Sequence, residues 1–201
     1  MSASELGVYS IAVLFLGALQ MGMQRLLGAV ALPAFSEAAR VNDTTRLHAL
    51  YVRFKLMFDL VSLFLCGLAW VLSPLLIHFL YDERYAGAGE MLAILSLSFF
   101  TWRFAVAHQV WLALGLTKYQ AMDNIIRAIS LWVLLPLLLA LGGAKYAIWG
   151  VALHALPTLI LVVYVNRKVG LFDLRRELIV LPMVLVGMVC GEAVLAIVNW
   201  F

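Results

Sequence analysis

Three arginines lie within long apolar stretches of the sequence, where a charged side chain needs a physical reason. Arg25 and Arg103 lie deep inside such stretches, and Arg127 lies in another. A charge near the centre of a bilayer costs about 2.5–3.5 kcal/mol on insertion scales unless it faces other helices or water. A guanidinium group also matches the oxygens of a phosphate and stays charged at physiological pH. We therefore expect Arg25 and Arg103, with Arg127 as a third candidate, to line a cationic cavity that binds an anion.

Other polar residues lie near these arginines at helical spacing. Gln20 and Gln24 stand one helical turn apart beside Arg25, and Ser96 lies seven residues before Arg103, on the same helical face. We count Gln20 and Gln24 among the candidate substrate-binding residues. The alternative is that each arginine pairs with a carboxylate or with helix-end carbonyls, or extends to the lipid headgroups.

Two acidic residues in the apolar stretches have a basic residue four positions away. Asp123 precedes Arg127 and Asp59 follows Lys55 at this spacing, which favours a local ion pair on one helical face. Glu192 has no such neighbour in the sequence. Asp59 and Glu192 are candidates for coupling to a proton or a cation, with a structural or interfacial role as the alternative.

The sequence contains no arrangement typical of an enzyme. His48 lies in a basic segment, and the other three histidines lie in different apolar stretches without the spacing of metal ligands. No Ser-His-Asp pattern, phosphate-binding glycine motif or cluster of carboxylates is present. We therefore expect neither catalysis nor a metal or cofactor site.

The composition identifies the kind of element that must position these residues. Of the 201 residues, 12% are charged and 65% are hydrophobic, and the mean hydropathy is +1.03. A soluble domain usually carries about 25% charged residues, so this chain has too few charges to cover a surface that faces water. Within lipid every backbone amide must be paired inside the protein, which favours helices. The composition thus indicates an integral membrane protein.

Six apolar segments are long enough to span a membrane as helices, which takes about 20 residues each. The Gly142-Gly143 pair is a helix-breaking signal between two of them. We predict an all-α, polytopic membrane protein in which residues 1–201 form a single transmembrane domain. The predicted spans are residues 6–35, 56–80, 90–116, 122–142, 146–166 and 178–199.

The distribution of lysine and arginine predicts the orientation, because cytoplasmic loops accumulate these residues. Alternate connections between the predicted spans carry nine basic residues, whereas the opposite side carries only Arg84 and Lys145. We therefore expect both termini outside and the basic loops in the cytoplasm, and no binding of nucleic acid despite a formal net charge of +3. The nine are Arg40, Arg46, Arg53, Lys55, Lys118, Arg167, Lys168, Arg175 and Arg176.

An N-terminus that crosses the membrane without a cationic leader is easier to understand if an upstream span delivers it. The sequence also ends at Trp200-Phe201 with no closing loop. We therefore expect the chain to be part of a longer protein.

Several segments together resemble polysaccharide flippases of the multidrug, oligosaccharidyl-lipid and polysaccharide exporter superfamily. Glu5-Leu6-Gly7-Val8-Tyr9-Ser10-Ile11-Ala12 is similar to the start of that family's second half. The match extends over most of the chain up to about Arg167. Further along, the resemblance is carried by Pro33-Ala34-Phe35-Ser36-Glu37, Asp43, Arg46-Leu47, Tyr51, Leu80-Tyr81-Asp82-Glu83-Arg84-Tyr85-Ala86-Gly87-Ala88, Pro136, Gly142-Gly143 and Gly150.

The resemblance implies a fold of two six-helix lobes around a central cavity, of which this chain supplies most of the second lobe and one further helix. It implies a bacterial plasma or inner membrane location and a substrate of the undecaprenyl-diphosphate oligosaccharide type. That substrate would be turned to the outer leaflet for assembly of surface polysaccharide, such as lipopolysaccharide O-antigen or exopolysaccharide. The implied partners are membrane lipid, the lipid-linked glycan and the missing first lobe or another membrane protein.

Two other functions remain open from the sequence. A drug or cation antiporter of the same superfamily would depend on Asp59 and Glu192 instead of the arginines. A non-transporting membrane subunit or truncated product would bind a partner protein through its exposed helices and move no substrate alone.

Overall fold

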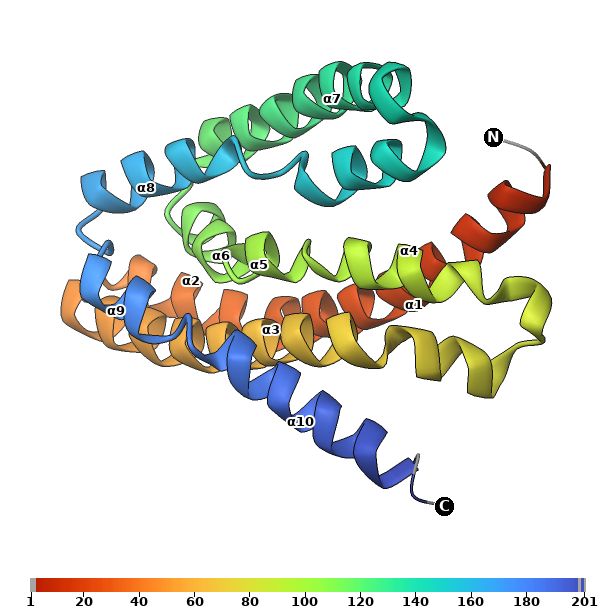
Figure 1. The fold of residues 1–201 in the computed structure, drawn as a ribbon. Helices are drawn as coiled ribbons and strands as arrows, with labels where there is room; N and C mark the ends of the chain where they lie inside the picture. The colour runs from red at the N-terminus through yellow and green to blue at the C-terminus, as the bar shows by residue number, and fades with distance from the viewer. Residues whose placement is uncertain (1–2, 199, 201) are drawn as a thin grey trace.

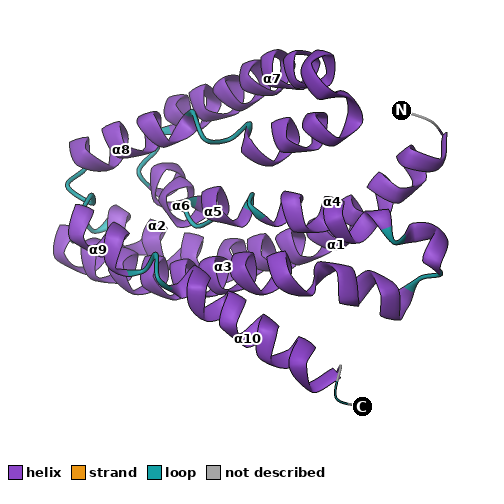
Figure 2. Cartoon of the chain, viewed as in Figure 1, coloured by secondary structure: helices purple, strands orange, loops and turns teal. Residues whose placement is uncertain are grey.

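The protein is helical, with short turns, over the residues that the computed structural model describes, which are 3–198 and 200 (Figures 1 and 2). Side chains are described for 6–198 and 200. Residue 199, at the end of the sixth predicted span, and the side chain of Glu5 lie outside these residues. The helices are α1 (Ala3–Leu26), α2 (Leu32–Arg40), α3 (Thr44–Leu80), α4 (Gly87–Ser96), α5 (Phe99–Trp102), α6 (Ala105–Ala113), α7 (Thr117–Leu153), α8 (Thr158–Lys168), α9 (Leu174–Ile179) and α10 (Met183–Val198), with a π-helix at Leu27–Ala31 and a 3₁₀ turn at Glu83–Tyr85.

Among the described residues, five helical segments are long and apolar enough to cross a membrane. The fourth includes α7 and α8 and corresponds to two of the six predicted spans. Its backbone is not helical at Gly142 and Gly143, and Figure 1 shows α7 turning back on itself. Gly143 has a φ of 71°, a left-handed conformation that glycine adopts without steric cost. The five segments are Leu6–Arg40, Thr44–Leu80, Gly87–Ala113, Thr117–Lys168 and Leu174–Val198.

The basic segment that the sequence assigns to a loop before residue 56 is mostly helical. Asp43 caps the start of α3, because its side-chain Oδ1 accepts a hydrogen bond of 2.8 Å from the backbone N–H of Arg46. Arg53 and Lys55 therefore lie on α3 rather than on a connection. Hydropathy underestimates the length of such a helix because its first turns are polar.

The first and third apolar segments are also interrupted. The π-helix at Leu27–Ala31 ends two residues before Pro33, whose ring nitrogen cannot donate to the carbonyl of Ala29. In the third segment, turns at Leu97–Ser98 and at Arg103–Phe104 separate α4, α5 and α6. These interruptions lie beside the polar groups described below.

Helix α3 lies between α4 and α10, and glycines allow α10 to pack against it very closely. A Cβ atom on Gly187 would overlap the carbonyl oxygen of Phe64, and one on Gly67 would overlap that of Val184. Gly187 and Gly191 are four residues apart, which is the small-residue spacing of closely packed membrane helices. The sequence contains this signal, although hydropathy alone does not reveal it.

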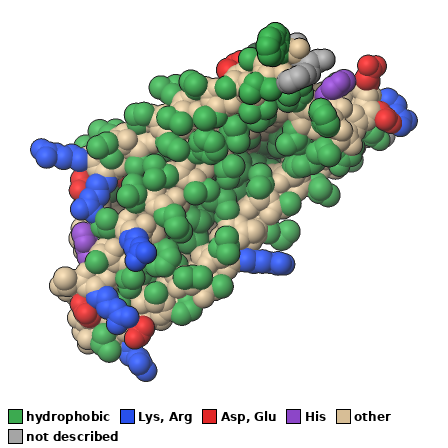
Figure 3. Space-filling model, turned by 90° about the horizontal axis from the view of Figure 1, so that it is seen from below, with side chains coloured by type: hydrophobic (Ala, Val, Ile, Leu, Met, Phe, Trp, Pro, Cys, Tyr) green, Lys and Arg blue, Asp and Glu red, His purple; other side chains and the backbone are tan. Residues whose placement is uncertain are grey.

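The buried core is small relative to the apolar surface. One core cluster surrounds Phe35 and Trp111, and a second surrounds Ile77 and Leu95. Many large apolar side chains are exposed instead, including Trp132 of α7, which is 80% exposed. Figure 3 shows hydrophobic side chains over the middle of one face and most charged side chains toward its ends. This distribution suits a multi-pass protein surrounded by lipid.

The connections between the long helices alternate between two ends of the bundle (Figure 1). Helix α1 begins and α10 ends at one end, where the Glu83–Tyr85 turn also lies. The connections α2–α3, α6–α7 and α8–α9 lie at the other end. The basic connections predicted to share one side therefore do lie at a common end of the molecule.

Candidate functional site

A polar pocket lies between α1, the α5–α6 region and α7. It has a volume of about 60 Å³, and Gln20, Gln24, His108 and Arg127 contribute its longer polar side chains. Gln20 and Gln24 reach it together because residues four apart lie on one helical face. The structure thus brings together three of the residues predicted to bind a substrate. The remaining lining residues are Met23, Phe58, Thr101, Trp102 and Ala105.

Arg127 is held in this pocket by its neighbour on the same helix. Its Nε donates a 2.7 Å hydrogen bond to Oδ2 of Asp123, so the local pair expected from their spacing is present. The terminal nitrogens of Arg127 make no hydrogen bond to any described residue, and the side chain is 25% exposed. One side of the guanidinium group is therefore oriented by Asp123, while the other can donate to a ligand.

His108, which lines the pocket, and Asp123, which pairs with Arg127, carry further hydrogen-bonding capacity. Nε2 of His108 lies 3.6 Å from Oδ2 of Asp123, beyond an ordinary hydrogen bond. Within the described residues, this nitrogen, Oδ1 of Asp123 and Oε1 of Gln120 are buried and have no hydrogen-bond partner. Of these three residues, His108 is the one that lines the pocket, so its Nε2 adds to the polar groups there.

Arg103 does not line this pocket. It is only 1% exposed, and its Nε donates a 3.2 Å hydrogen bond to Oδ1 of Asp59. Its Nη2 donates to the Glu177 carboxylate and, at 3.3 Å, to the Glu177 backbone carbonyl. The guanidinium group also lies 5.0 Å from the ring centroid of Phe104. Arg103 is therefore paired with carboxylates, which the sequence left open as the alternative to anion binding, and this pairing favours a structural role. Substrate binding by Arg103 stays a prediction.

Lys55 completes a buried ion cluster of two cations and two anions, formed by Lys55, Asp59, Arg103 and Glu177. Nζ of Lys55 lies 2.6 Å from Asp59 and 3.2 Å from the Glu177 carboxylate. The Lys55–Asp59 pair expected from the sequence is therefore present. The cluster joins α3, the α5–α6 turn and α9, which places charges that are 74 residues apart in contact.

Sequence reasoning missed Glu177 and Asn166. Glu177 is the acidic residue on the short basic helix α9, a weak signal without knowledge of what α9 contacts. Asn166 is buried: its Oδ1 accepts a 3.1 Å hydrogen bond from the Trp111 indole, and its Nδ2 donates at 3.2 Å to the Tyr51 hydroxyl. A lone asparagine at the end of an apolar run was its only signal in the sequence.

The other predicted residues lie on the surface. Arg25 is exposed on α1, and Glu192 is exposed on α10. Among the described residues neither has an ion-pair partner. Arg25 lies in the segment Leu6–Arg40, which has few residues buried inside the protein along its apolar part. An unpaired guanidinium group there requires water, a headgroup or another protein surface.

Comparisons of the chain with models of protein families, with curated proteins and with solved structures find no match. The resemblance to exporter-superfamily flippases therefore stays a prediction from the quoted segments. Three features of the structure bear on function: the polar pocket, the exposed Arg25 and the apolar surface. These features suit the binding of a polar or anionic group within a largely apolar environment.

Proposed function

We propose that this chain forms one lobe of a transporter that moves an undecaprenyl-diphosphate-linked oligosaccharide across a bacterial plasma membrane for the assembly of surface polysaccharide. The observation that carries the proposal is the pocket in which Gln20, Gln24, His108 and Arg127 meet between apolar helices. Arg127 lies ten residues after the start of α7, or ~15 Å along the helix, so the pocket is far from the helix end.

The pocket offers donors that suit a phosphate and sugar hydroxyls. The free terminal nitrogens of Arg127 can donate to phosphate oxygens, while Asp123 keeps the group oriented. The amides of Gln20 and Gln24 can both donate to and accept from sugar hydroxyls. Such contacts offset the cost of removing a polar headgroup from water, and the polyprenyl tail stays in lipid.

A pocket of about 60 Å³ holds only part of such a substrate, so a second surface must complete the cavity. Gln24 and Arg25 are both exposed on α1, whose apolar segment is little buried within this chain. In the proposal, a second lobe faces α1 and encloses the headgroup between the two. Arg25 then contributes charge to this shared cavity.

The proposal includes six membrane crossings, with α7 crossing before its Gly142-Gly143 break and returning with α8. It places both termini outside and the basic end of the bundle in the cytoplasm, as the excess of lysine and arginine favours. The Lys145–Glu90 pair, 2.9 Å apart, then lies at the outer end, next to the α7 break.

A second candidate is a membrane subunit that binds another protein and transports nothing. The exposed, unpaired Arg25 on a poorly buried helix supports this function equally well, because a partner carboxylate could cover it. A cation antiporter is less favoured, since Asp59 is occupied by Lys55 and Arg103. The two leading functions differ in whether the polar pocket matters.

The test is restoration of surface polysaccharide in cells that lack the gene, using wild-type protein and an Arg127→Gln variant in its full natural context. We expect Arg127→Gln to reduce surface polysaccharide at least tenfold at unchanged protein level, with lipid-linked intermediate accumulating inside. The matched control is Arg84→Gln, because Arg84 also pairs locally, with Asp82 at 2.9 Å, but lies outside the pocket. Normal polysaccharide with Arg127→Gln, together with loss on removal of the whole protein, would instead support the subunit function.

A further inference from the structure

Several exposed cations at the basic end of the bundle have no carboxylate partner among the described residues, and three of them lie where α7 begins and α8 ends. Lys118 lies at the start of α7, and Arg167 and Lys168 lie at the end of α8; all three are exposed. By contrast, Arg46 and Arg176, near the same end, form ion pairs with Glu37 and Asp173. The three unpaired cations therefore have charge available for an anion from outside the protein.

Each of these cations contacts an aromatic ring, and the two lysines share one. Nζ of Lys118 and Nζ of Lys168 lie 5.1 and 5.8 Å from the centroid of the same ring, that of Tyr119. Lys168 also donates a 3.2 Å hydrogen bond to the Tyr119 hydroxyl, which ties α8 to α7. Arg167 lies 5.0 Å from the ring centroid of Phe172. Cations held in this way lose less freedom when they bind an anion.

An apolar surface leads directly to these charges. One face of α8 lines an open groove of about 670 Å³, formed by Ile160, Val163, Tyr164, Arg167 and Lys168. Ile160 is 78% exposed and Tyr164 is 56% exposed, so this stripe has no cover within the described chain. From Ile160 to Arg167 the helix rises ~10 Å, so the stripe is apolar at one end and cationic at the other.

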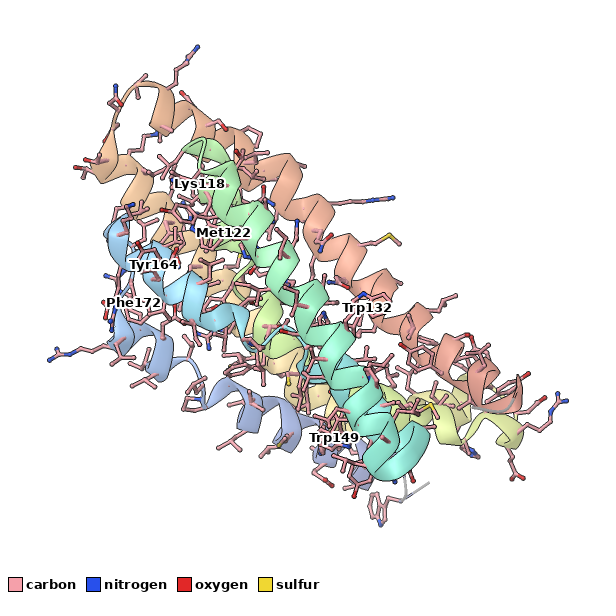
Figure 4. All side chains as sticks on the ribbon, turned by 90° about the horizontal axis from the view of Figure 1, so that it is seen from above. Lys118, Met122, Trp132, Trp149, Tyr164 and Phe172 are labelled. Carbon is pink, nitrogen blue, oxygen red and sulfur yellow. The ribbon has the colours of Figure 1, made fainter. Side chains whose placement is uncertain are left out.

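We propose that this groove, together with Lys118, binds an anionic phospholipid, with the phosphate at the three cations and an acyl chain along Ile160 and Tyr164. Figure 4 shows Lys118, Tyr164 and Phe172 gathered at the same end of the molecule. A free phosphate would use the cations but not the apolar stripe. Basic clusters where membrane helices meet the headgroup layer bind anionic lipids by the same combination of charge and apolar contact. The proposal is independent of transport and of the pocket at Arg127.

The test measures lipid retained by the full-length chain, purified in detergent and analysed by native mass spectrometry with added phosphatidylglycerol or phosphatidylcholine. We expect the wild-type protein to retain more phosphatidylglycerol than phosphatidylcholine. The amount of phosphatidylglycerol retained should fall about tenfold or more in a triple variant with Lys118→Gln, Arg167→Gln and Lys168→Gln. The control, Arg40→Gln, Arg53→Gln and Arg175→Gln, removes three other exposed cations without carboxylate partners and should retain it.

A second variant separates a lipid from a free phosphate. Ile160→Gln should weaken phosphatidylglycerol retention without removing charge, and inorganic phosphate at equal concentration should not compete. Equal loss in both triple variants, equal retention of both lipids, or full competition by phosphate would overturn the proposal. Preference for undecaprenyl diphosphate over phosphatidylglycerol would also overturn it, by making the groove a substrate site. Unchanged helical circular dichroism in each variant shows that binding, not folding, has changed.

Discussion

Arg103 and Arg127 have identical side chains, but the structure leaves them with different hydrogen-bonding capacity. Arg103 is enclosed by Asp59 and Glu177, and its cationic neighbour Lys55 shares the same two carboxylates. Arg127 has a single carboxylate partner and free terminal nitrogens. The same residue type in an apolar helix therefore stabilises the fold in one case and remains available to a ligand in the other.

Removing Asp59 should destabilise the protein strongly. Asp59→Asn leaves Lys55 and Arg103 with one carboxylate between them, and an uncompensated buried charge costs about 3–5 kcal/mol. We expect the free energy of unfolding, measured by denaturation in mixed micelles, to fall by about that amount. Glu192→Gln, at an exposed and unpaired position, should change it little. A loss of the same size in both variants would show that the ion cluster has no special structural role.

At this scale, the sequence predicted local contacts but not distant ones. The Lys55–Asp59 and Asp123–Arg127 pairs follow from a spacing of four residues on a helix. The contact of Arg103 with Glu177 spans 74 residues and depends on how α9 returns to α3, which spacing does not encode. The sequence therefore predicted the local partner of Arg127 but gave no sign that Glu177 pairs with Arg103.

Helix α10 packs on α3 through glycines rather than through interlocking large side chains. Close approach of membrane helices depends on small residues, because lipid competes equally well for large apolar ones. Gly187 and Gly67 lie where any Cβ atom would overlap backbone carbonyl oxygen of the facing helix. These two positions therefore set the distance between α3 and α10.

Enlarging Gly187 should separate these helices. Gly187→Val places a side chain against the backbone at Phe64, and overpacking of this kind costs about 1–3 kcal/mol. We expect a lower melting temperature in detergent and faster proteolysis after α9. Gly22→Val is the comparison, because a Cβ atom on Gly22 has no neighbour within 4 Å. If the two variants melt at the same temperature, the close packing of α10 does not stabilise the protein.

The sequence predicted where the helices change direction better than where they begin. The Gly142-Gly143 break lies as predicted, since glycine pairs disfavour helix directly. The polar first turns of α3 were assigned to a loop because hydropathy measures lipid compatibility rather than helix formation. The interruptions on either side of α5 have no proline or glycine to mark them and depend on tertiary packing.

The whole molecule has an apolar exterior and a cationic end. Its exposed tryptophans, leucines and isoleucines leave an apolar surface that water would disfavour, whereas lipid or a second lobe would not. The composition predicted this property correctly, because too few charged residues exist to cover the surface. The sequence does not show which part of this surface would contact a second protein, and Arg25, a charged residue within an apolar stretch, is its one indication.

The proposed orientation can be tested by labelling single cysteines in intact cells. In a background with Cys66→Ala and Cys190→Ala, we expect Arg84→Cys to react with a membrane-impermeant maleimide from outside. Arg40→Cys should react only after permeabilisation, because the excess of basic residues favours the cytoplasm. Both residues are exposed, so access to the reagent depends on the membrane alone. The opposite pattern of labelling would reverse the orientation.

Whether the pocket at Arg127 binds a diphosphate headgroup can be measured as equilibrium binding of undecaprenyl diphosphate to the full-length protein in nanodiscs. We predict that Arg127→Gln raises the dissociation constant about tenfold or more, since a charge-assisted hydrogen bond contributes about 1.5–3 kcal/mol. Arg84→Gln should leave it unchanged. An Arg127→Gln protein that binds undecaprenyl diphosphate as tightly as wild type would contradict the account.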